Sequence, residues 1–152
     1  MDLRKWYAVA QAYRGGGFLY HATMPTDSLR IFRDRLKALQ AFGVDLATQR
    51  QWQIGAAVRK LLAANGFPSV AAEEFQSPGV VVVYTDNDDL KSGKAFAAAG
   101  LQIAAGVPLQ CDEGDDFKTF RLGLFGLYKY ENVDRALQPL QQALQKIGKA
   151  KL

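Results

Sequence analysis

The sequence contains one cysteine, one histidine and no long apolar run. A single cysteine, Cys111, excludes an intramolecular disulfide framework and is typical of a reducing compartment, so we expect a cytoplasmic protein. The longest apolar run, GVVVVY at 79–84, has the length of a strand and predicts no membrane span. The closing Ala150-Lys151-Leu152 loosely resembles a peroxisomal S-K-L address, which leaves that alternative location open.

The charge pattern excludes another class of partner. The net charge is +4, but the basic residues are scattered and no dense basic run alternates with aromatics, so we expect no nucleic-acid partner. Hydrophobic residues make up 49% of the 152 residues and charged residues 22%, which is typical of a globular protein with a core of its own.

Helical spacing of apolar residues predicts four long helices. They cover residues 3–13, 26–43, 45–65 and a last stretch that begins near Asn132. Thr26 is expected to cap the second helix, and Asn65-Gly66 to end the third. Pro139 lies inside the last helix and should kink it or delay its start.

The second half of the chain mixes short strands with helices. We expect strands at 79–84, 101–106 and 118–126, and one short helix within 86–100, capped by Asp86 or Asn87. The order predicts an α+β unit, a small sheet with helices on one face. The pattern of residues 1–45 differs from that of the second half, because glycines interrupt a segment that then leads into a long helix.

Three places have side chains suited to chemistry. Tyr20 and Thr23 are two hydroxyls on one short segment before a helix start, which suits an anion such as phosphate. His21, between them, lacks an evident partner for base catalysis and is as easily explained by packing. The acidic stretch CDEGDD at 111–116 lacks metal-binding spacing, so we expect a solvated loop and no metal site.

Arg121 is unusual because it interrupts an apolar strand, FKTFRLGLFG at 117–126. Strand alternation places Thr119 and Arg121 on one face and Phe120 and Leu122 on the other. The arginine is then either an edge residue that reaches for solvent or a fixed fork for a carboxylate. Residue types alone leave both alternatives open.

Taken in order, three stretches resemble a known family. They are YHATMPTDSLRIFRDRL, PGVVVVYTDNDDLKSGKAFAAAGLQIAAGVP and FKTFRLGLFGLYKYENVDRALQPLQQAL. Together they resemble the C-terminal part of class V aminotransferases, which are fold-type I enzymes that depend on pyridoxal 5'-phosphate. Within this class, the alanine–glyoxylate and serine–pyruvate aminotransferases are the most similar.

The resemblance implies a division of the chain. Residues 1–25 correspond to a remnant of the large cofactor-binding domain, residues 26–45 to the helix between domains, and residues 46–152 to the small C-terminal domain. In the family, residues that match Tyr20 and Thr23 contact the cofactor phosphate of the neighbouring subunit, and His21 would support them.

Arg121 matches the family's arginine for the substrate's α-carboxylate. The implied substrates are an amino acid, such as alanine or serine, and a 2-oxo acid, such as glyoxylate or pyruvate. The family is homodimeric and builds its sites across the subunit interface, so a homodimer is expected.

The family's Schiff-base lysine lies upstream of the matching region. The lysines that fall outside the matching context are Lys5, Lys37, Lys60, Lys91, Lys94, Lys118 and Lys129. We therefore expect a fragment that contains no catalytic residue, binds no cofactor by itself and is inactive alone.

Two alternatives stay open. A cysteine desulfurase shares the fold, but Cys111 is its only candidate nucleophile, and neighbouring carboxylates should raise its pKa. A standalone α+β binding module without catalysis would have no need of residues 1–25. A fragment would instead expose apolar residues there, such as Trp6, Tyr7 and Phe18, and would tend to self-associate.

Overall fold

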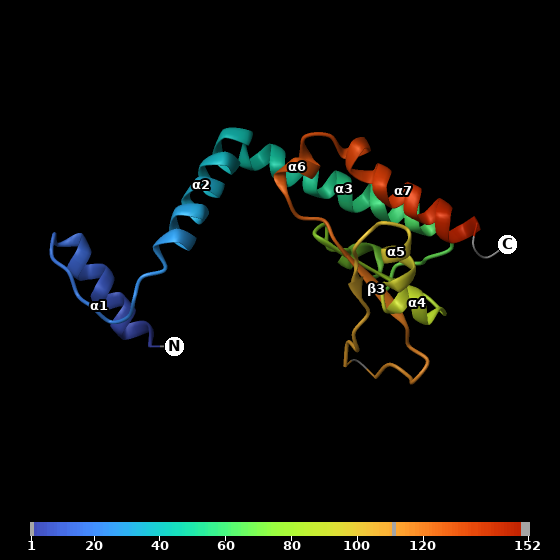
Figure 1. The fold of residues 1–152 in the computed structure, drawn as a ribbon, viewed down its shortest axis with the longest axis horizontal. Coiled ribbons are helices and arrows are strands. Elements are labelled where there is room, and N and C mark those ends of the chain that lie inside the picture. The colour runs from blue at the N-terminus through green and yellow to red at the C-terminus, as the bar shows by residue number, and fades with distance from the viewer. Residues whose placement is uncertain (1, 111, 150–152) are drawn as a thin grey trace. The chain divides into compact units, whose positions relative to one another are not determined.

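The computed structural model describes residues 2–110 and 112–149. The chain divides into two compact units, Met1–Ala38 and Leu39–Leu152 (Figure 1). The boundary falls inside the second helix. Cys111 and the closing Ala150-Lys151-Leu152, which bear on two of the expectations above, lie outside the described residues.

The first unit contains helix α1, Leu3–Arg14, and most of helix α2, Thr26–Phe42. The carboxylate of Asp2 caps α1 by accepting a hydrogen bond from the Lys5 amide, and Gly15 ends the helix as expected. No regular structure forms between Gly17 and Pro25. Because α2 begins at Thr26 itself, Thr26 lies inside the first turn, and its expected role as N-cap is wrong.

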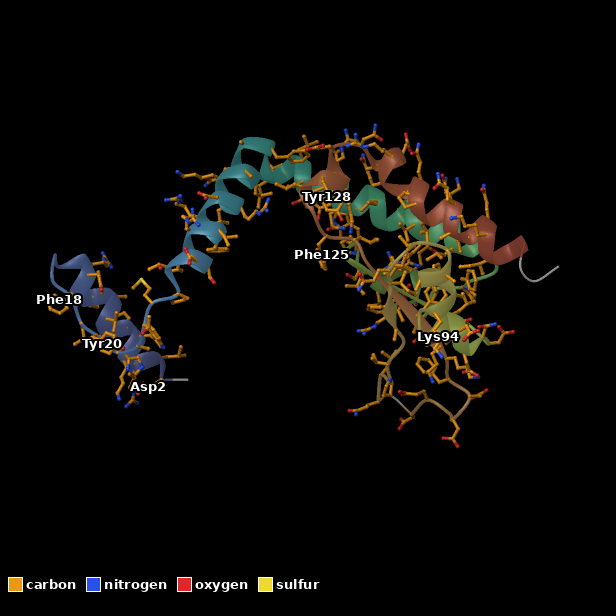
Figure 2. The ribbon with its side chains drawn as sticks, viewed as in Figure 1. Asp2, Phe18, Tyr20, Lys94, Phe125 and Tyr128 are labelled. Carbon is orange, nitrogen blue, oxygen red and sulfur yellow. The ribbon has the colours of Figure 1, made fainter. Side chains whose placement is uncertain are left out.

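Apolar side chains of the first unit are largely exposed. Val9 is the one buried residue of α1, and α2 buries none. Tyr7 is 66% exposed and Phe18, whose side chain is labelled in Figure 2, is 82% exposed. Trp6 differs from the expectation, because it is half-buried against the ring of His21.

The second unit is α+β. Its helices are α3 (Val44–Ala64), the 3-10 turn η1 (Glu73–Phe75), α4 (Asp88–Lys91), α5 (Lys94–Ala98), α6 (Leu127–Tyr130) and α7 (Val133–Lys149). Its strands are β1 (Val80–Tyr84), β2 (Ala104–Ala105) and β3 (Thr119–Gly123). The α+β class expected from the sequence is confirmed.

Two local expectations need correction. The single helix expected within 86–100 is two short helices, α4 and α5, because Gly93 between them adopts a left-handed conformation with φ +82°. Of the two effects expected of Pro139, a delayed start of α7 is wrong, since the helix begins at Val133 and the side chain of Asn132 accepts a hydrogen bond from the Arg135 amide.

The sheet is antiparallel with the strand order β1-β3-β2, so β3 is central. One face is the core side, where Val81, Val83, Phe120 and Leu122 are buried against α3, α5 and α7. Phe120 is fully buried, and its ring centroid lies 5.2 Å from that of Phe67 and 5.0 Å from that of Phe96. Helices therefore cover one face of the sheet, and the other face carries Arg121.

Candidate functional site

Arg121 occupies the middle of the central strand. Its cross-strand partners are Val82 on β1 and Ala104 on β2, and its neighbours Phe120 and Leu122 point into the core. Alternation therefore places Arg121 on the face opposite the helices, as the sequence predicts. Because β3 is central, the alternative that Arg121 is an edge residue is wrong.

One hydrogen bond orients the guanidinium group. Its Nε donates to the carbonyl oxygen of Ala105 at 2.9 Å, and the side chain is half-buried. Within residues 2–110 and 112–149, the ion pairs closer than 4.0 Å do not include Arg121. A guanidinium held through Nε can still offer its terminal nitrogens to a carboxylate as two parallel donors.

The surroundings of Arg121 on this face are apolar and open. Val80 and Tyr84 lie on the same face of β1, at 37% and 41% exposure. Phe125, just beyond β3, is 63% exposed (Figure 2). A cation beside exposed apolar side chains attracts an anion more strongly once the face is covered, because the local dielectric then falls.

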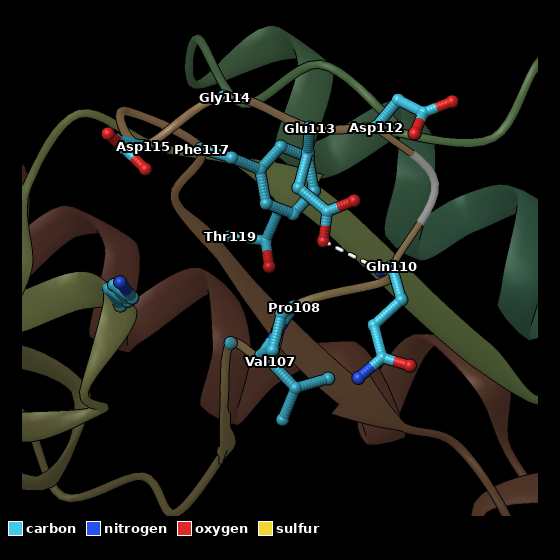
Figure 3. Close-up of a pocket in the computed structure, with 11 residues that line it drawn as sticks. Val107, Pro108, Gln110, Asp112, Glu113, Gly114, Asp115, Phe117 and Thr119 are labelled. Carbon is cyan, nitrogen blue, oxygen red and sulfur yellow. Dashed lines mark hydrogen bonds between the residues drawn. The ribbon is translucent and has the colours of Figure 1, made fainter.

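A loop beside this face encloses a hollow of about 600 Å³ (Figure 3). Most of its wall comes from the loop residues 106–108, 110, 112–115 and 117. Lys91 and Thr119, which lies two residues before Arg121, form the rest. A carboxylate oxygen of Glu113 accepts hydrogen bonds from the amides of Leu109 and Gln110 at 2.5 and 2.8 Å. These two hydrogen bonds join Glu113 to the segment just before it and so restrain the loop.

The acidic part of the loop is solvated. Asp112, Asp115 and Asp116 are exposed. In the described part of the chain, no group of three His, Cys, Asp or Glu side chains could hold a metal ion.

No described helix is both long and apolar enough to cross a membrane.

The hydroxyl pair lies in the irregular segment of the first unit. Tyr20 is 76% exposed, and Thr23 is also exposed (Figure 2 labels Tyr20). The half-buried ring of His21 lies edge-on to Trp6, with the ring centroids 5.1 Å apart. His21 therefore packs against Trp6, whereas Tyr20 and Thr23 on either side of it are exposed.

Sequence reasoning missed two backbone features of the site. The Ala105 carbonyl that orients Arg121 leaves no trace in residue type. Gly106 lets the chain pass β3 so closely that a Cβ would lie 1.9 Å from the Thr119 carbonyl oxygen. A glycine directly after a short strand can signal such a close approach.

The comparisons with known proteins bear on the fold. No family model and no curated protein matches the sequence. A solved structure, the alanine–glyoxylate aminotransferase from Nostoc sp., is similar to 83% of this chain with a TM-score of 0.63 and 21% sequence identity. The match spans only 33% of that protein's chain. At 21% identity the similarity shows that this chain shares the fold of part of that protein, and the shared part is about a third of that protein's length.

Proposed function

We propose that this chain supplies the substrate-carboxylate site of a pyridoxal-phosphate-dependent aminotransferase. The reaction moves an amino group between an amino acid, such as alanine or serine, and a 2-oxo acid, such as glyoxylate or pyruvate. The observation that carries the proposal is the position of Arg121 on the open face of the central strand, with Nε held by Ala105.

Arg121 suits both substrates for one reason. An amino acid and a 2-oxo acid share a planar α-carboxylate, and a guanidinium binds such a group with two parallel hydrogen bonds. Because Nε is already bonded to the backbone, the group is oriented before substrate arrives. Arg121 therefore positions the substrate, which is a large part of catalysis in a two-substrate reaction.

Tyr20 and Thr23 fit the phosphate end of the cofactor. Both hydroxyls are exposed donors on an irregular segment that precedes α2. We propose that they bind the cofactor phosphate of a neighbouring subunit, which requires a homodimer, and that His21 supports the segment by packing on Trp6.

Bound pyridoxal phosphate supplies the electron sink for the reaction, and the protein supplies binding and orientation. We assign no residue of this chain to the covalent bond with the cofactor or to its pyridine nitrogen. The chain is accordingly proposed to be inactive alone and to need residues from elsewhere for amino-group transfer.

The carboxylate site can be tested by NMR on the isolated chain. Titration with pyruvate should shift the Nε–Hε resonance of Arg121 more than that of Arg50, which lies on α3 and bonds Gln53. Arg121→Lys should abolish the saturable response of neighbouring amides, whereas Arg50→Lys should leave it intact. Equal responses at both arginines, or a response that survives Arg121→Lys, would contradict the assignment.

Cofactor binding has its own test. The purified chain is mixed with pyridoxal phosphate, reduced with borohydride and analysed by mass spectrometry. We expect no stoichiometric adduct at any single lysine. A full adduct at one position, for example Lys94, would show that the chain has cofactor chemistry of its own and would refute its proposed dependence on other residues.

A further inference from the structure

A second hollow opens on the helix side of the sheet, on the face opposite to that of Arg121. Its volume is about 420 Å³, and it is lined from α3, α6, α7, the end of β3 and residues 101–103. Most of the lining is aliphatic, and its deepest members include the core residues Ile54, Val58 and Leu140. The size falls in the range of about 300–1,000 Å³ that is usual for small-molecule pockets.

The charged groups of the lining share one sign. Its polar side chains are Gln102, Tyr128, Lys129 and Arg135, and no carboxylate is among them. The Nζ of Lys129 donates to the Gly123 carbonyl at 3.0 Å and lies 5.5 Å from the centre of the Tyr128 ring. This contact holds the ammonium group at the hollow while leaving it further donors.

Arg135 contributes less to the charge of the hollow. Its guanidinium already pairs with Glu131 on the turn before α7, at 3.5 Å, and both side chains are more than half exposed. Of the two cations in this lining, Lys129 is therefore the one that has no carboxylate within 4.0 Å in the described part of the chain.

We propose that this hollow binds a small amphiphilic carboxylate, such as a medium-chain fatty acid. The hydrocarbon chain occupies the aliphatic interior, because burial of apolar surface is favourable. The carboxylate pairs with Lys129 at the rim. The site is separate from the proposed aminotransferase function, because Arg121 lies on the other face of the sheet.

Calorimetric titration of the full chain with decanoate, and with 1-decanol as a neutral probe, tests the charge. Lys129→Gln should weaken decanoate binding about fivefold, the upper end for a solvent-exposed ion pair, and leave decanol unchanged. Lys94→Gln, an exposed lysine on α5 outside the hollow, is the matched control and should alter neither. Equal effects of the two variants on decanoate would overturn the role of Lys129.

A second variant tests the location. Ala136 lines the hollow from α7 and is half-buried, so Ala136→Phe should fill the space and remove binding of both probes. Unaltered binding by a folded Ala136→Phe would overturn the site, and so would failure of both probes to bind the natural chain. Arg121→Lys should leave decanoate binding intact, and loss of binding there would place the ligand on the other face and refute the proposal.

Discussion

Replacing Gly106 by alanine tests how closely the loop passes the central strand. The new Cβ would lie 1.9 Å from the Thr119 carbonyl oxygen and 2.7 Å from its carbonyl carbon. Both atoms belong to the backbone of β3, so no side-chain rotation can relieve the overlap. Residues 106–108 must move away, which endangers the hydrogen bond from the Gly106 amide to the Lys91 carbonyl at 3.0 Å.

The expected cost combines two effects. Overpacking at a well-packed site costs about 1–3 kcal/mol. Loss of one backbone hydrogen bond adds about 0.5–1.5 kcal/mol. We therefore expect Gly106→Ala to lower the free energy of unfolding by about 2–4 kcal/mol, a large share of the roughly 5–15 kcal/mol of an ordinary domain.

Urea unfolding followed by circular dichroism measures this loss, with Gly123→Ala as the control. Gly123 is exposed and lies on β3, the strand that Gly106 approaches. A Cβ added at Gly123 would have no atom within 4 Å. Its replacement should be neutral or stabilise by up to about 1 kcal/mol, because a strand glycine is entropically costly. A cost for Gly106→Ala below about 1 kcal/mol, or equal to that of Gly123→Ala, would refute the close approach.

Two further predictions concern the packing of the core and the stability of the chain at low pH. Phe120→Ala should cost about 3–5 kcal/mol in urea unfolding, because Phe120 is fully buried between Phe67 and Phe96; a loss under about 1 kcal/mol would contradict that packing. Lys118, 2.9 Å from Asp88, lowers the pKa of that carboxyl below its ordinary value by hydrogen bonding and charge. The Lys118–Asp88 pair therefore stabilises the folded chain at a pH above the unfolded-state pKa of Asp88, and this stabilisation is lost as the pH falls through the folded-state pKa. Asp88→Asn should lower stability slightly at neutral pH and match the natural chain in strong acid; a deficit independent of pH would oppose this.

Much of the helical structure follows from local sequence. The third helix ends where Asn65-Gly66 predicts, because Gly66 adopts φ +83° and the Phe67 amide donates back to the Leu62 carbonyl at 3.0 Å. The start of α7 at Val133 is local in the same way, because the side chain of the preceding Asn132 accepts a hydrogen bond from the Arg135 amide. Caps and helical periodicity involve residues within a few positions of one another, so residue types alone suffice to predict them.

Local reasoning failed where packing chose between two allowed conformations. A glycine at position 93 is compatible with one continuous helix or with a break. In the structure the helix is interrupted at Gly93, and Leu90 and Phe96 on either side are both buried in the core. That choice depends on the core surface they meet, which lies far away in the sequence.

For the candidate site, the sequence by itself determined which residues could do chemistry and that Thr119 and Arg121 share a face of a strand. The alternation of side chains on a strand is a local rule. Only the tertiary structure decided that this strand is central, that Ala105 orients the guanidinium and that Gly106 lies against Thr119. These features join segments 13 to 39 positions apart, as in the pairing of Val82 with Arg121, and pairing over such separations depends on burial of the whole core, which no local pattern encodes.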